Sequence, residues 1–115
     1  KLGSDVNAAY SSEMNTIALH AGILQDDLYD PKQSNFRNYG MLGSIIGHEI
    51  THGFCKDGSA YDGNGKLNSI WTNATENAYQ NIVKCLVNQV ENFEIYGTNL
   101  KMNGTILIKK NSIIL

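Results

Sequence analysis

Residues 39–54 read YGMLGSIIGHEITHGF, and this stretch decides how the chain folds. Its apolar residues are three and four positions apart, which is the spacing of one helical face: Leu42, Ile45, Ile46, Ile50 and Phe54. We therefore predict a helix over residues 39–54, although its glycines lower the helix propensity. Glycines inside a helix usually indicate close packing against another backbone.

The same stretch contains the pattern HExxH, made by His48, Glu49 and His52. Histidines four residues apart lie on one face of a helix, about one turn apart, so both imidazoles can bind one Zn²⁺. Glu49 would project beside them and accept a proton from a metal-bound water as a general base. The pattern is rare by chance in a chain of this length, so we interpret it as a metal site.

Length and composition exclude several classes of protein. The chain has 115 residues, of which 17% are charged and 42% hydrophobic, with a net charge of −2 and two cysteines. These values exclude a disordered tail and a disulfide-dense scaffold. The slightly acidic balance argues against binding to nucleic acid or to a phospholipid surface, and no apolar run is long enough to span a membrane.

The N-terminal half outside this helix is predicted to form short elements. Apolar runs at residues 5–10 and 15–19 indicate two brief strands, separated by polar residues. Residues 25–38 hold the only proline and read as a loop with room for one helical turn. Residues 55–70 contain three turn-forming pairs that end in glycine, which favours a hairpin-like loop.

The C-terminal half contains the second long helix, predicted over residues 74–93. One stripe of this helix is apolar: Ala78, Ile82, Leu86, Val90 and Phe93. Asn73 can cap it, and Glu76 three residues later resembles a capping box. Residues 105–115, TILIKKNSIIL, favour a strand by their β-branched content.

A catalytic zinc ion needs a third protein ligand and an open position, and three residues are candidates for that ligand. His20 is the only other histidine, and its strand context fits a packing or surface residue better. Glu76 lies 24 residues after His52, but we prefer its capping role. Cys55 could offer a thiolate three residues after His52, although that spacing is tight.

Several segments together resemble one family. These are 38–54 (NYGMLGSIIGHEITHGF), 6–10 (VNAAY), 21–25 (AGILQ), 71–72 (WT), 85–87 (CLV, with Gln89) and 103–104 (NG). They resemble, in the same order, segments of the neprilysin and endothelin-converting-enzyme family of zinc metalloendopeptidases. The resemblance covers nearly all of residues 5–111.

The resemblance implies a function for five residues. His48 and His52 would bind one zinc ion per chain, and Glu49 would be the general base. Asn7 and Ala8 would lie on an edge strand that pairs with the backbone of a small peptide substrate. The implied fold is α+β: a thermolysin-like zincin fragment, mainly helical, with a short edge sheet at its N-terminal end. The implied location is extracellular or in a plasma-membrane ectodomain.

The chain departs from the family at three positions. Aligned on Asn103 and Gly104, the family's third zinc ligand, a glutamate, becomes Lys110, whose ammonium has no lone pair for a metal. The two aspartates that orient the zinc histidines become Cys55 and Ile114, and losing such partners typically costs 10- to 100-fold in affinity or activity. We expect weaker zinc binding, unless the C-terminal end is misaligned or follows a frameshift.

We therefore interpret residues 1–115 as part of a metallopeptidase catalytic domain. The predicted function is hydrolysis of peptide bonds by a zinc-activated water, with impaired activity in this chain. The alternative is a non-catalytic pseudo-peptidase or peptide-binding remnant. The expected partners are small peptides and the remainder of the peptidase chain, to which Cys85 would bridge. A bridge between Cys55 and Cys85 is a further option that the sequence leaves open.

Overall fold

The protein is described by a computed structural model that covers residues 5–25 and 27–106. The chain forms two compact units, residues 1–69 and residues 70–115. Each unit is described on its own below. The first unit contains the predicted metal site.

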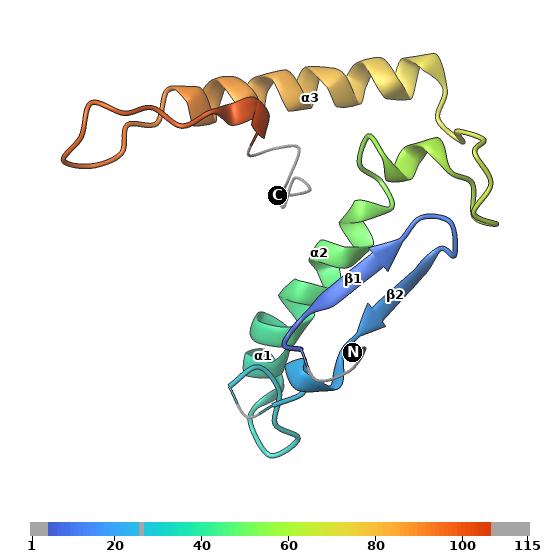
Figure 1. Ribbon diagram of the computed structural model, residues 1–115, viewed down its shortest axis with the longest axis vertical. Coiled ribbons are helices and arrows are strands. Elements are labelled where there is room, and N and C mark those ends of the chain that lie inside the picture. The colour runs from blue at the N-terminus through green and yellow to red at the C-terminus, as the bar shows by residue number, and fades with distance from the viewer. Residues whose placement is uncertain (1–4, 26, 107–115) are drawn as a thin grey trace. The chain divides into compact units, whose positions relative to one another are not determined.

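The first unit begins with a β-hairpin (Figure 1). Strand β1 (Ala8–Ser11) pairs in antiparallel fashion with β2 (Thr16–Leu19), with Ala8 opposite Leu19 and Ser11 opposite Thr16. Asn15 lies just before β2 with φ 45°, a left-handed conformation that asparagine tolerates better than most residues. The two strands predicted from the sequence are confirmed; β1 begins three residues later and ends one residue later than predicted, and β2 begins one residue later.

The helix predicted over residues 39–54 is longer at its start and shorter at its end. It begins as α1 (Asn35–Asn38), passes through a π-helical turn (Tyr39–Gly43) and continues as α2 (Ser44–His52). The room for one helical turn in the loop 25–38 is thus filled by α1. Single π-turns inside helices occur frequently at functional sites.

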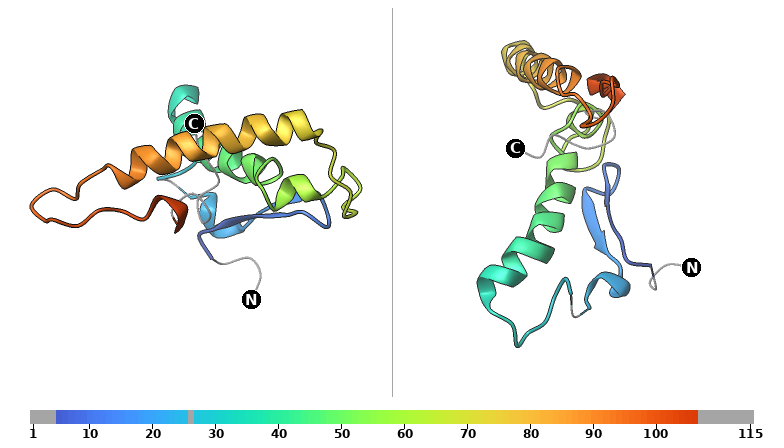
Figure 2. Two further views of the ribbon diagram at one scale, coloured as in Figure 1. Left: turned by 90° about the horizontal axis from the view of Figure 1, so that it is seen from above. Right: turned by 90° about the vertical axis from the view of Figure 1, so that its left-hand side faces the viewer.

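The hairpin runs alongside α2, as Figure 1 and the right-hand view of Figure 2 both show. Ala8 from β1, Ile23 from a 3₁₀ turn (Ala21–Ile23) and Leu42 from the π-turn are buried between them. Leu28, Ile45 and Ile46 are partly buried and pack against these three side chains. This small core fixes which side of α2 faces β1.

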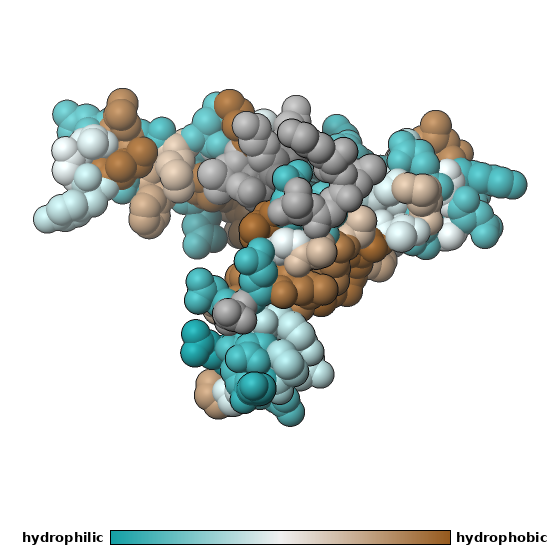
Figure 3. Space-filling model, turned by 60° about the horizontal axis from the view of Figure 1, so that its bottom comes forward, coloured by the Kyte–Doolittle hydropathy of each residue, from teal (hydrophilic) through white to brown (hydrophobic). Residues whose placement is uncertain are grey.

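Two members of the predicted apolar face do not reach this core. Ile50 is 49% exposed and Phe54 is 57% exposed. The predicted face was therefore wrong from Ile50 onward, because the core-facing side passes through Glu49 instead. Other large apolar side chains, such as Phe36, are exposed too, and Figure 3 shows apolar surface on the face that it displays.

The segment after α2 folds back towards the hairpin. It contains a 3₁₀ turn (Gly58–Ala60) and a loop that the Tyr61–Leu67 bridge closes, as the prediction of hairpin-like structure requires. The Asn15 side chain donates to the carbonyl of Gly63 at 3.1 Å and so joins this loop to the hairpin.

The carboxylate of Asp62 holds the tip of this loop together. The backbone N–H groups of Lys66 and Asn64 donate to it and lower the pKa of Asp62 below its usual 3.8. Hydrogen bonds to the charged form of a carboxyl have this effect. The charged side chain therefore favours the folded loop.

The second unit is dominated by α3 (Asn73–Glu91). Its cap differs from the prediction, since Thr72 accepts a hydrogen bond from the N–H of Thr75 at 3.2 Å and Asn73 is already helical. Glu76 accepts from Gln80 at 2.7 Å, so it does not complete a capping box. No described residue of α3 is buried, which leaves the predicted apolar stripe without a core within this structure.

The described residues that follow α3 correct one further prediction. Thr105 and Ile106 are helical, where the sequence favoured a strand. The side chain of Asn103 accepts from the N–H of Ile106 at 3.0 Å, and this capping bond outweighs the β-propensity of Thr105 and Ile106. The rest of the predicted strand, residues 107–115, lies outside the described residues.

In the part of the chain that the structure describes, no helix is both long and apolar enough to cross a membrane. Both cysteines, Cys55 and Cys85, are free thiols.

Candidate metal centre

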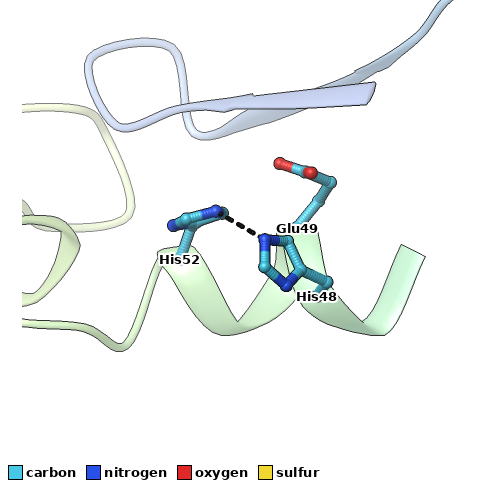
Figure 4. A group of neighbouring side chains, drawn as sticks. All are labelled: His48, Glu49 and His52. Atoms are coloured by element: carbon cyan, nitrogen blue, oxygen red, sulfur yellow. Dashed lines mark hydrogen bonds between the residues drawn. The ribbon is translucent and has the colours of Figure 1, made fainter. Parts of the chain in front are cut away.

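The helix α2 brings His48, Glu49 and His52 together (Figure 4). Each offers one ligand atom, and these atoms all lie within 4.8 Å of one another. The Nε2 atoms of His48 and His52 are 3.1 Å apart, and their rings meet edge to face, with centroids 4.7 Å apart and an interplanar angle of 86°. The HExxH spacing has therefore produced the cluster that the sequence predicted.

The two imidazoles are placed as ligands of one small cation would be. Zinc lies about 2.0–2.1 Å from a histidine nitrogen, so two nitrogens that share a tetrahedral zinc are about 3.3 Å apart. The observed 3.1 Å, at which the two rings share a hydrogen bond in this structure (Figure 4), is close to that separation. Imidazole nitrogens are also donors that zinc favours. The residues present fit a zinc ion.

Glu49 lies on the side of α2 that packs against the hairpin. It is three residues after Ile46 and four after Ile45, so it continues the core-facing stripe, and it is 7% exposed. In Figure 4 its carboxylate extends from the helix towards the strands. A carboxylate in such a place is unusual because burying a charge is unfavourable unless something compensates it.

The strand β1 presents a free edge beside this cluster. The carbonyl of Asn7 accepts from the N–H of His20 at 3.1 Å. Asn7 and His20 are therefore a hydrogen-bonded pair of the ladder, directly before Ala8. In an antiparallel ladder such pairs alternate, and the backbone groups of Ala8 and Tyr10 therefore point away from β2. The described sheet has two strands, so this edge of β1 is unpaired within it.

The side chains of the two predicted substrate-binding residues differ in their surroundings. Asn7 is exposed, and its Oδ1 accepts from the N–H of Ala8 at 2.9 Å. The Ala8 methyl group belongs to the core, at 8% exposure. Ala8 therefore has two tasks that the sequence did not separate: its side chain fastens β1 to α2, and its carbonyl lies on the outer edge.

The chain resembles known proteins along most of its length. Residues 7–113 match Peptidase family M13. The chain belongs to this family. It is 41% identical over 106 residues to Neprilysin-11 of Caenorhabditis elegans and 40% identical over 106 residues to Endothelin-converting enzyme-like 1 of Homo sapiens, matches that each cover 92% of this chain.

Solved structures of zinc metalloproteases agree with this assignment to family M13. The zinc metalloprotease Zmp1 of Mycobacterium tuberculosis, solved with an inhibitor, superimposes with a TM-score of 0.82 at 35% identity over 90% of this chain. The resemblance stated from the sequence is thus confirmed, together with a mixed fold of helices and a small sheet. The chain spans 12% of Neprilysin-11, 13% of the human relative and 16% of the Zmp1 chain.

Two of the three candidate third ligands, Cys55 and His20, lie outside the cluster of His48, Glu49 and His52. Within residues 5–25 and 27–106, the group that could hold a metal consists of His48, Glu49 and His52. Cys55 directs its thiol to the carbonyl of Thr51 at 3.2 Å. Glu76 belongs to α3 in the second unit.

His20 is also outside the cluster. Its backbone pairs with Asn7, and its Nδ1 is buried with no hydrogen-bond partner among the described residues. The predicted packing role of His20 is therefore closer to what is observed than a ligand role. Lys110 and Ile114, the two substituted positions near the C-terminus, lie outside the described residues.

Sequence reasoning missed Tyr10 and Asn15, which connect the hairpin to the end of α2. The Tyr10 hydroxyl donates to Asn15 Oδ1 at 2.9 Å, and its ring lies next to Gly53, directly after His52. One signal was available, because Tyr10 is two residues after Ala8 and alternation along a strand puts both side chains on one face.

Proposed function

We propose that this chain forms the metal-binding part of a zinc metalloendopeptidase of family M13, with one zinc ion per chain. His48 and His52 are the proposed ligands and Glu49 the proposed general base. The observation that carries the proposal is the 3.1 Å separation of the two Nε2 atoms, with the Glu49 carboxylate within 4.8 Å of both. Membership of the family supports the same assignment.

The chemistry divides between the metal and the protein. Zinc, when bound, supplies a Lewis acid that polarises a carbonyl and lowers the pKa of water towards 7. Glu49 takes a proton from the attacking water and returns it to the leaving amine, so the carboxylate ends each cycle unchanged. Burial beside both imidazoles restricts the rotamers of the Glu49 side chain, so the carboxylate is already oriented for the proton transfer.

The proposed substrate is a small peptide held in extended form along β1. The outward carbonyl of Ala8 can accept a hydrogen bond from a peptide backbone, and the exposed Asn7 side-chain NH2 group, whose partner oxygen accepts from the Ala8 N–H, can donate a further one.

We also propose that both units are parts of one catalytic domain with a thermolysin-like fold. The remainder of the peptidase is then a partner of this segment. The proposed location of the protein is outside the cell.

We propose further that zinc binding and hydrolysis are weak in this chain. The reason is the alignment of Lys110 with the third-ligand glutamate, and of Cys55 and Ile114 with the aspartates that orient the histidines. Position 55 carries a thiol, which donates to the carbonyl of Thr51, and therefore has no carboxylate to orient an imidazole. An ammonium at the third position would repel the ion as well as fail to bind it.

Zinc titration of single alanine variants tests the ligands. His48→Ala and His52→Ala should each weaken zinc binding by more than about 100-fold, beyond the 10- to 100-fold typical of residues that only contact a ligand. His20→Ala is the matched control, because it removes the remaining histidine outside the cluster. Equal loss in all three variants would contradict the assignment.

Cleavage of a quenched fluorescent peptide tests the activity. Little turnover is expected from the chain, and any turnover should vanish in Glu49→Gln. Robust turnover that depends on Glu49 would contradict the proposal that hydrolysis is weak in this chain. The double reversion Lys110→Glu with Ile114→Asp should raise zinc affinity by at least about tenfold, and no change would count against the alignment.

The second candidate function is a peptide-binding remnant without catalysis. The observation in its favour is the free edge of β1, which needs no metal to bind an extended peptide. In this case a fluorescent peptide should bind equally well with and without a chelator and stay intact. Binding that requires zinc would favour the peptidase instead.

A further inference from the structure

His52 is the last residue of α2. The N–H groups of Gly53 and Phe54 reach back only three residues, to the carbonyls of Ile50 and Thr51 at 3.1 and 2.9 Å. The last turn of a helix lacks the full set of hydrogen bonds and opens more readily than its middle. His48 lies inside the helix, so of the two imidazoles His52 is the one that needs support from elsewhere.

Gly58 supplies contact from one side. A Cβ at this position would lie 2.0 Å from the carbonyl oxygen of His52 and 2.8 Å from the Cα of Gly53. Both neighbours are backbone atoms, which cannot rotate out of the way. Gly58 is buried and its φ is not positive, so the requirement is for space rather than for a special backbone conformation.

Gly53 receives a second contact, from the side chain of Tyr10. A Cβ here would lie 3.1 Å from the hydroxyl oxygen of Tyr10 and 3.3 Å from its Cζ. The Tyr10 side chain is held by its hydrogen bond to Asn15, whose amide in turn donates to Gly63. The ring thus rests on the backbone directly after His52, while Gly58 rests on the carbonyl of His52 itself.

We propose that Gly53 and Gly58 together form a glycine brace that positions His52 for the metal. Neither touches the reacting atoms; each acts through His52 by letting a neighbouring segment close against the end of α2. The proposal rests on the proposed function, because it takes His52 to be a zinc ligand. The expected consequence of a side chain in the brace is a displaced His52 Nε2 and weaker metal binding.

Three glycine-to-alanine variants of the whole chain test the brace at constant chemistry. Gly47→Ala is the control, since a Cβ there meets nothing within 4 Å although it adjoins His48. Gly53→Ala crowds a side chain that can shift, so zinc affinity should fall by a few fold. Gly58→Ala crowds backbone, so affinity should fall by at least about tenfold, in the range seen when residues that orient a ligand are lost.

Two further measurements separate positioning from general loss of structure. The absorption spectrum of the Co²⁺-loaded chain reports the ligand geometry, and it should change in Gly58→Ala and stay as in the wild type in Gly47→Ala. Hydrogen exchange should speed up in the last turn of α2, at Gly53 and Phe54, and remain unchanged in the middle of α3. A purely global loss of stability would speed up both.

Each outcome decides something. Unchanged zinc affinity, Co²⁺ spectrum and exchange in a folded Gly58→Ala chain overturn the brace. If Gly58→Ala does not fold, Gly53→Ala decides, and an affinity equal to that of Gly47→Ala overturns it. A wild-type chain that binds zinc no better than its His48→Ala variant overturns the proposed function instead, so the two failures are distinguishable.

Discussion

Glu49 places a carboxylate on the core-facing side of α2, and its replacement by methionine measures what that placement costs. The side chain is 7% exposed and continues the stripe of Ile45 and Ile46, which pack against the core. A buried carboxylate loses hydration, whereas a methionine of similar length gains free energy on burial. We expect Glu49→Met to raise the free energy of unfolding of the metal-free chain while it removes the proposed general base.

The expected gain is about 1 kcal/mol. A methionine side chain contributes roughly 1.5–3 kcal/mol when fully buried instead of exposed. The smaller figure follows from the small core, in which Ala8, Ile23 and Leu42 are the buried apolar residues among those described. A gain of about 1 kcal/mol raises the ratio of folded to unfolded chain about fivefold.

Urea denaturation in the presence of a chelator, followed by circular dichroism, measures this gain. Glu49→Gln is the matched control, because it removes the charge and keeps a polar group of the same shape. The expected order of stability is Glu49→Met above Glu49→Gln. A methionine variant no more stable than the glutamine variant would refute the reasoning, since it would mean that position 49 does not favour an apolar side chain.

Three further variants test the rest of the structure. Thr72→Ala should cost about 1 kcal/mol of unfolding free energy through the lost cap of α3, and Asn73→Ala should cost much less when both are compared by urea denaturation. Gly65→Ala should destabilise more than Gly97→Ala: both glycines have positive φ, worth about 1–2 kcal/mol, but only at Gly65 would the Cβ lie 1.7 Å from a carbonyl oxygen. Asp62→Ala should lower the thermal midpoint at neutral pH. Folding lowers the pKa of Asp62, so the stabilisation by its carboxylate is present above pH 3.8 and is lost as the pH falls through the pKa of the folded state. An equal effect of Asp62→Ala in acid would contradict this prediction.

The metal cluster could be predicted from the sequence because its geometry is local. Positions four apart in a helix face the same way whatever surrounds the helix, so HExxH alone implies two neighbouring imidazoles with a carboxylate beside them. The two short strands could be predicted for a similar reason, since each is a short apolar run bounded by polar residues. Both predictions depend on contacts between near neighbours in the chain.

The errors arose where another contact competed with the local pattern. Positions 49 and 50 both fit the helical spacing of a core-facing stripe. Only the direction from which β1 approaches α2 decides that Glu49 is buried and Ile50 is exposed. Asn73 and Thr72 are both good capping residues, and the choice depends on where the helical dihedral angles begin. At Thr105 and Ile106 a single hydrogen bond to Asn103 outweighed the strand propensity.

The two histidines of the motif therefore depend on different parts of the chain. His48 lies within α2, and helical hydrogen bonds on both sides set its position. His52 is the last helical residue, and its position depends on Tyr10, from the hairpin, and on Gly58, from the turn that follows. The motif sets the spacing of the ligands and so brings their nitrogen atoms within 3.1 Å, whereas the proposed brace acts on the last turn of α2, which carries His52. A chain with an intact HExxH and a side chain at position 58 should accordingly keep the middle of α2 and bind zinc at least about tenfold more weakly.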